Sequence, residues 1–215
     1  MGEPILVYGK SGSGKSRSLK NFGSDEIYLI NVLGKRMPFP GKFKYVTRTR
    51  SYDVIKQGLL KMPCKVAVID DAGYLQTSEF MAGHAAPKKG SNTFDLYNQI
   101  GDDLWNLMLF IKDQLPEDVF VYVLMHEISN DMGETKVRTI GKLIDEKVCL
   151  EGMFTICLHC ITDGEKHYFR TQGGPLDIAK SPEDMFDLEI ENDLKAVDTR
   201  CREYWGLTEN VEQSN

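Results

Sequence analysis

Short apolar runs alternate with segments of helical periodicity along the first 125 residues. Apolar runs of this length, bounded by glycine or aspartate, are typical of strands buried in a parallel sheet. They predict strands over residues 5–8, 26–32, 43–47, 65–69 and 119–125. Apolar residues spaced three or four apart predict helices over residues 15–22, 51–61, 94–115 and 190–205, with Ser51 as the N-cap of the second.

The last third of the chain predicts an antiparallel addition to this sheet. Two β-rich runs, 150–162 and 166–171, flank Asp163-Gly164, a dipeptide typical of tight hairpins. We therefore expect an α/β fold with a mostly parallel central sheet, flanked by helices, and a late antiparallel hairpin.

Loops and boundaries follow from glycine, proline and polar residues. We expect loops over 34–41, 76–93 and 129–136, and Ser181-Pro182-Glu183 predicts a helix start. There is no repeat and no linker, so we expect a single domain over residues 1–206 and a flexible tail over 207–215.

Composition narrows the class of protein. The 26 basic and 32 acidic residues give a net charge of −6, which is not the overall signature of a nucleic-acid binder, so such a role would need a local basic patch. No signal peptide or membrane-spanning run is evident, which predicts a soluble protein of the cytoplasm. Five scattered cysteines argue against a disulfide framework.

The strongest motif follows the first predicted strand. It fits G-x-x-x-x-G-K-[ST] in full, with a strand before it and a predicted helix after it: Gly9-Lys10-Ser11-Gly12-Ser13-Gly14-Lys15-Ser16. Glycines let backbone N–H groups turn toward phosphate oxygens, Lys15 reaches the β- and γ-phosphates, and Ser16 supplies a hydroxyl to magnesium. The motif predicts a site for ATP and Mg²⁺.

A carboxylate partner is expected at the end of another strand. Asp70 ends the run over 65–69, so it should face the crevice at the carboxyl edge of the sheet and act as the magnesium-associated acid. Asp71 follows directly, and either positions the attacking water or caps the next segment. Two further candidates end the strand over 119–125: His126 as a sensor of the γ-phosphate, and Glu127 as an alternative base that orients water.

Four segments together resemble bacteriophage nucleotide-binding proteins of the RecA-like P-loop ATPase group. They are the N-terminal P-loop, KVAVIDDAGYL, VYVLMHE, and the late stretch TQGGPLDIAKSPEDMF with IENDLKAVD. The resemblance covers roughly residues 4–206 and is close to phage single-strand annealing proteins of the Sak type. The late segments are the most specific part of this resemblance, because the P-loop and the acid strand occur in many P-loop ATPases.

The resemblance implies a RecA-like core that binds ATP, magnesium and single-stranded DNA in the host cytoplasm and serves phage recombination, annealing or replication. A phage single-strand-binding protein is a further candidate partner. In RecA-like proteins two loops face the DNA, and the matching positions here hold Lys88 and Lys89, and Lys136 and Arg138. Such basic loops suit contacts with a phosphate backbone.

The chain departs from the family at one place. RecA-like recombinases carry a catalytic glutamate at the end of the strand after the P-loop helix, where this chain has Asn31-Val32. Slow hydrolysis is therefore expected, with Asp71 or Glu127 as substitute. The family also implies a homo-oligomer in which a neighbouring subunit supplies a basic residue, for which we favour Lys180 over Arg170 and Lys35.

Two other functions stay open from the residues. A small-molecule or nucleoside kinase would use the same phosphate cradle, although no arginine-rich lid is evident. A nucleotide-dependent assembly or packaging factor would need no catalytic glutamate.

Overall fold

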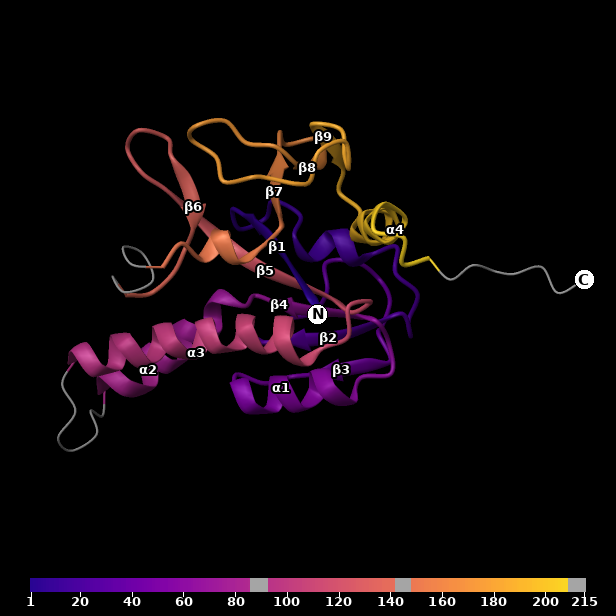
Figure 1. Cartoon of the computed structure of the whole chain (residues 1–215). Helices are drawn as coiled ribbons and strands as arrows, with labels where there is room; N and C mark the ends of the chain where they lie inside the picture. The colour runs from indigo at the N-terminus through magenta and orange to yellow at the C-terminus, as the bar shows by residue number, and fades with distance from the viewer. Residues whose placement is uncertain (86–92, 142–147, 209–215) are drawn as a thin grey trace, which may run out of the picture.

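The predicted strands are present and lie in one mixed sheet (Figure 1). The structure is a computed structural model that describes residues 1–85, 93–141 and 148–208. Within them the sheet consists of β1 (Glu3–Gly9), β2 (Ile27–Asn31), β3 (Tyr45–Thr47), β4 (Val66–Asp70), β5 (Phe120–Ser129), β6 (Thr135–Val137), β7 (Ile156–Thr162), β8 (His167–Arg170) and β9 (Glu189–Glu191).

The strand order is β3-β2-β4-β5-β1-β7-β8-β9, with β6 paired to β5. The six strands from β3 to β7 run parallel, whereas β8, β9 and β6 are antiparallel to their neighbours. The expectation of an α/β fold with a mostly parallel sheet and a late hairpin is thus confirmed. Because β1 and β4 both border β5, three strand ends meet at one stretch of the carboxyl edge.

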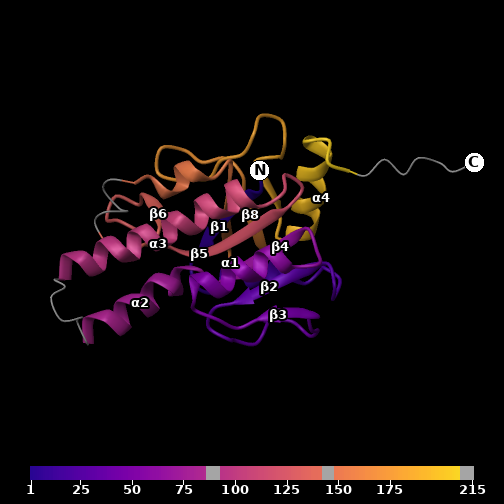
Figure 2. The same cartoon turned by 60° about the horizontal axis from the view of Figure 1, so that its bottom comes forward.

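Helices cover both faces of the sheet (Figures 1 and 2). One face carries α1 (Tyr52–Lys61), α2 (Gly73–Ala85) and α3 (Thr93–Gln114). The other carries the 3₁₀ helix η1 (Ser16–Leu19) and α4 (Leu194–Tyr204). A second 3₁₀ helix, η3 (Leu150–Met153), occupies the start of the run predicted over 150–162, so the strand β7 begins only at Ile156.

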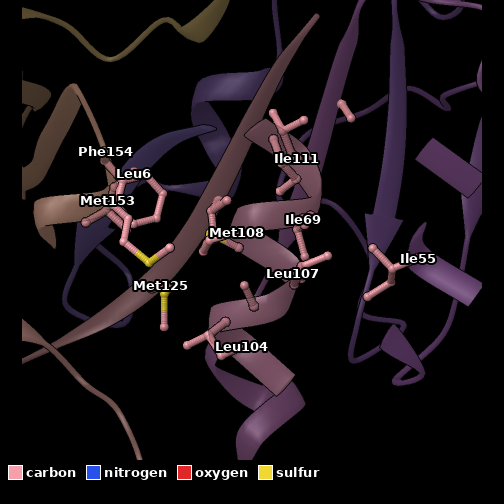
Figure 3. Packing of buried hydrophobic residues seen from close by; sticks show 14 of the residues in the cluster. Leu6, Ile55, Ile69, Leu104, Leu107, Met108, Ile111, Met125, Met153 and Phe154 are labelled. Atoms are coloured by element: carbon pink, nitrogen blue, oxygen red, sulfur yellow. The ribbon is translucent and has the colours of Figure 1, made fainter. Parts of the chain in front are cut away.

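The core forms because successive strand residues point to opposite faces. In β1, Leu6 and Tyr8 enter the cluster under α1–α3, whereas Ile5 and Val7 enter the cluster under η1 and α4. Figure 3 shows the first cluster, in which α3 residues such as Leu107 pack toward β4 and β5. Burying each such side chain contributes about 1.5–3 kcal/mol.

Two predicted helices are wrong. Residues 15–22 form only η1, where the Ser18 hydroxyl donates to the Lys15 carbonyl and competes with a regular helical ladder. Ser181-Pro182-Glu183 starts no helix, because the chain there turns toward β9. The C-terminal helix begins at Leu194 instead, where the Asp193 carboxylate accepts from the backbone N–H groups of Lys195 and Ala196.

Two predicted loops are partly regular. Residues 76–85 belong to α2, which packs on α3 through the stacked rings of Phe80 and Tyr97, 5.7 Å apart. The segment over 129–136 is mostly a hairpin, since β5 continues to Ser129 and β6 begins at Thr135. In both cases tertiary packing outweighs the local polar composition.

Candidate phosphate-binding site

The P-loop leaves the sheet at the end of the central strand β1. Gly9 allows the closest approach there, because a Cβ atom at this position would lie 2.3 Å from the Cys160 carbonyl oxygen. Gly14 has a φ of +109°, in the region that favours glycine. These two positions fix the curl of the loop.

Lys15 lies inside the curl. Its side chain is buried, and its ammonium group donates to the carbonyl oxygens of Gly9 and Lys10, both at 2.8 Å. Burial lowers the pKa of Lys15, while the nearby Cys160, Asp71 and Asp70 counteract this. A buried cation at the centre of the loop attracts a polyanion.

The β7–β8 hairpin supports the loop from one side. The Ser13 carbonyl oxygen accepts from the Cys160 thiol at 3.2 Å and lies 2.7 Å from Nδ1 of His167. These contacts position the loop although only η1 follows it.

Ser16 and Asp70 meet across 54 residues of sequence. The Ser16 hydroxyl donates to Oδ1 of Asp70 at 2.8 Å, and Asp70 is 2% exposed. Burial raises the pKa of Asp70, and the hydrogen bond from Ser16 opposes this effect. Asp70 thus lies at the carboxyl end of the buried strand β4, beside Ser16 of the P-loop.

The pair fits a magnesium ion by its chemistry. Hydroxyl and carboxylate oxygens are the ligands that Mg²⁺ prefers, and Mg²⁺ takes few protein ligands beside phosphate and water oxygens. In the described part of the chain no group of three or more His, Cys, Asp and Glu could hold a metal ion. Ser16 and Asp70 would therefore hold the ion together with phosphate oxygens.

Asp71 turns the chain out of the sheet with a φ of +61°, a conformation that aspartate tolerates better than most residues. Its carboxylate is buried and lies 2.5 Å from the ammonium group of Lys35. Its carbonyl oxygen accepts from the N–H of Tyr74 at the start of α2. Asp71 thus ties the loop after β2 to the carboxyl edge of the sheet beside Asp70.

His126 lies opposite Gly9 in the register of β5 and β1. Its ring meets that of Tyr74 edge to face at 5.8 Å. Burial lowers the pKa of His126, and the charge of Lys15 lowers it further. Both effects favour the neutral imidazole. The backbone carbonyl oxygen of His126 accepts from the N–H of Arg138, beyond β6.

Glu127 belongs to a buried network that the sequence did not indicate. Its Oε2 lies 2.7 Å from Nε2 of His159, whose Nδ1 lies 2.7 Å from Oδ2 of Asp177. The Tyr8 hydroxyl donates to Asp177, and the Tyr8 ring stacks on His159 at 4.6 Å. Burial lowers the pKa of His159, but the two carboxylates outweigh this and raise it to about 9.

Glu127 therefore forms an ion pair with the imidazolium of His159. His159 lies between Cys157 and Cys160, which are buried on opposite faces of β7. No signal in the sequence could pair His159 with Glu127, because only the adjacency of β1 to both β5 and β7 brings them together.

The remaining predicted residues are the basic residues of the two expected DNA-facing loops and Lys180. Lys136 and Arg138 are exposed on and after β6, while Lys88 and Lys89 lie outside the described residues. Lys180 exchanges two backbone hydrogen bonds with Cys157, which is level with Leu6 and so three residues below the end of β1. Among the described residues, the Lys180 side chain makes no hydrogen bond or ion pair with the P-loop of its own chain.

Comparisons with protein-family models and with curated proteins give no match to this chain. No described helix combines the length and apolar character needed to cross a bilayer.

Proposed function

We propose that this protein is a magnesium-dependent P-loop ATPase with a RecA-like core, which binds single-stranded DNA and supports phage recombination, annealing or replication. The observation that carries the ATPase part is the hydrogen bond between Ser16 and Asp70 beside the buried Lys15. These three side chains supply one cation and two magnesium ligands at the same edge of the sheet. Magnesium, when bound, neutralises charge on the β- and γ-phosphates.

The strand order supports a RecA-like core. Strand β5, which carries His126, lies between β1, which precedes the P-loop, and β4, which ends at Asp70. His126 therefore stands where loss of a γ-phosphate can reach the following β5–β6 hairpin. That hairpin projects from the sheet and carries the exposed Lys136 (Figure 1). Its backbone is coupled to His126 through the N–H of Arg138.

The ATPase proposal is tested by binding of a fluorescent ATP analogue with Mg²⁺ and with EDTA. Lys15→Ala should weaken binding roughly 10- to 100-fold, because a charge-assisted contact contributes about 1.5–3 kcal/mol. Lys20→Ala, at an exposed lysine after η1, is the matched control and should bind as the wild type does. Wild-type affinity in Lys15→Ala would overturn the assignment.

The DNA part is tested separately by ATP turnover with and without single-stranded DNA. We expect stimulation, and weaker DNA binding with a lower salt dependence in Lys136→Ala and Arg138→Ala. Absence of both binding and stimulation at low salt would contradict the DNA part only. Phosphate transfer to a small acceptor would instead support the kinase alternative.

A further inference from the structure

A pocket lies beside the carboxyl edge of the sheet, between β2, β3 and the segment that joins them. Its volume is about 580 Å³, within the range of small-molecule sites. Because β2 is three strand spacings from β1, this pocket is about 14 Å from the P-loop strand. It is lined by Leu29, Asn31, Lys35, Arg36, Met37, Phe39, Pro40, Gly41, Lys42, Phe43, Val46 and Arg48.

The rim of this pocket is cationic. Four of its lining residues are basic, and no acidic residue lines it within the described part of the chain. Residues 35–50 hold six basic residues and no acid, in a chain with a net charge of −6. Lys35 is engaged by Asp71, which leaves Arg36, Lys42 and Arg48 to face an anion.

Two aromatic rings stand among these cations. Phe39 and Phe43 are half-buried and meet edge to face at 6.1 Å. Aromatic side chains between basic residues are the combination that binds nucleotides, because the ring stacks on a base while the cations hold its phosphate.

The pocket also contains a buried acceptor. Asn31 is 3% exposed, and its side-chain N–H donates to the Lys35 carbonyl at 2.7 Å. Its Oδ1 is buried without a hydrogen-bond partner among the described residues. A buried unpaired acceptor costs about 1–3 kcal/mol, which a ligand with an N–H donor would recover. Nucleobases carry such donors.

We propose that this pocket binds a nucleoside monophosphate, either free or as one unit of a single strand. The phosphate lies on Arg36, Lys42 and Arg48, and the base lies on Phe39 and Phe43 with an N–H toward Asn31. The site is distinct from the P-loop and does not depend on the proposed ATPase function. The ion pair between Lys35 and Asp71 connects the pocket to the proposed magnesium ligand Asp70.

The experiment uses full-length protein carrying Lys15→Ala, so that the P-loop does not capture the probe. Titration calorimetry with 5′-dAMP should show binding, and 2-deoxyribose 5-phosphate should bind roughly tenfold more weakly because it lacks the base. Arg48→Gln, Lys42→Gln and Phe39→Leu should each weaken dAMP binding roughly tenfold. Lys61→Gln, at an exposed lysine of α1, is the matched control and should leave it unchanged.

The outcomes separate the two sources and the two proposals. Tighter binding of a 5′-phosphorylated dA₁₂ than of dAMP assigns the site to a strand, and the reverse assigns it to a free nucleotide. The proposal is overturned if neither dAMP nor the phosphorylated dA₁₂ binds, or if neither Arg48→Gln nor Lys42→Gln weakens the binding. Wild-type ATP binding bears only on the P-loop, so failure of one proposal is distinguishable from failure of the other.

Discussion

At the scale of single residues, the buried carboxylate of Asp70 lowers the stability of the folded protein. Asp70 is buried beside Asp71, and burial raises its pKa, so its ionised form opposes folding. A contribution of this sign is fully favourable below the ordinary pKa of aspartate and is lost as the pH rises through the raised value. Near neutral pH the ionised Asp70 carboxylate therefore lowers the stability of the fold, which agrees with the magnesium-binding role proposed for it.

Replacing this carboxylate should separate stability from binding. Asp70→Asn should raise the free energy of unfolding by about 1 kcal/mol at pH 8 without nucleotide, and the gain should shrink toward pH 3. The same variant should bind the ATP analogue more weakly with Mg²⁺. Urea unfolding at several pH values measures the first effect, with Asp53→Asn on the exposed face of α1 as control. A gain that is independent of pH would contradict this account of Asp70.

Two glycines of the P-loop should respond differently to alanine. In Gly9→Ala the new Cβ would meet backbone at Cys160, so we expect a loss of about 3 kcal/mol or more together with nucleotide binding. Gly12 has a φ of +81° but open space around it, so Gly12→Ala should cost about 1 kcal/mol. Thermal unfolding of the two variants checks the order, and equal losses would speak against close packing at Gly9.

At the scale of elements, buried polar contacts join the strands around the P-loop. Glu127 of β5, His159 of β7 and Asp177 of the loop between β8 and β9 form one chain of hydrogen bonds over Tyr8 of β1. Burial raises the pKa of Asp177, but the bonds from His159 and Tyr8 outweigh it and lower it to about 2. The network is therefore charged at neutral pH and sets how β5, β7 and this loop lie around β1.

The pH dependence of stability should report this network. The pKa of His159 is raised from 6.5 to about 9, so its stabilisation is full below pH 6.5 and is lost as the pH rises through 9. The pKa of Asp177 is lowered to about 2, so its stabilisation is present above pH 3.8 and is lost as the pH falls through 2.

Wild-type stability should thus fall by roughly 3 kcal/mol more than that of His159→Asn between pH 6.5 and 9. Urea unfolding across this range is the measurement. His84→Asn, at an exposed histidine of α2, should follow the wild type. Parallel profiles for wild type and His159→Asn would show that the network carries no such charge.

At the scale of the whole molecule, the proposed hydrolysis depends on association of subunits. Asn31 stands where RecA-like recombinases carry a glutamate, and Glu127 and Asp71 are each engaged by a cation of their own chain. Lys180 does not reach the P-loop of its own subunit, which leaves its proposed role to a neighbour.

Turnover per subunit should therefore rise with protein concentration, and further with single-stranded DNA. Lys180→Ala should bind the ATP analogue normally but lose most of this rise, since a basic residue supplied in trans contributes orders of magnitude in rate. Steady-state turnover at several concentrations, with binding measured alongside, is the test. A specific activity that does not change with concentration would rule out the contribution in trans.

The sequence predicted the strands of the sheet well and their surroundings less well. Buried apolar runs such as that of β4 leave few alternatives, whereas α2 was expected to be a loop because its regularity depends on the packing of Phe80 against Tyr97. The predicted helix after the P-loop is reduced to η1, although the motif around it is intact.

The sequence by itself determined the glycine-rich loop around Lys15, because glycine conformation and the charge of Lys15 are local properties of eight consecutive residues. It also placed Asp70 at a strand end, since parallel strands end at a common edge. Only the tertiary structure decided the partners. The strand order placed β7 beside β1 and so joined His159 to Glu127, and the path of residues 35–48 beside β2 gathered basic residues and Phe39 around Asn31. The first contact joins segments far apart in the chain and the second depends on the path of an irregular loop, and no local pattern encodes either.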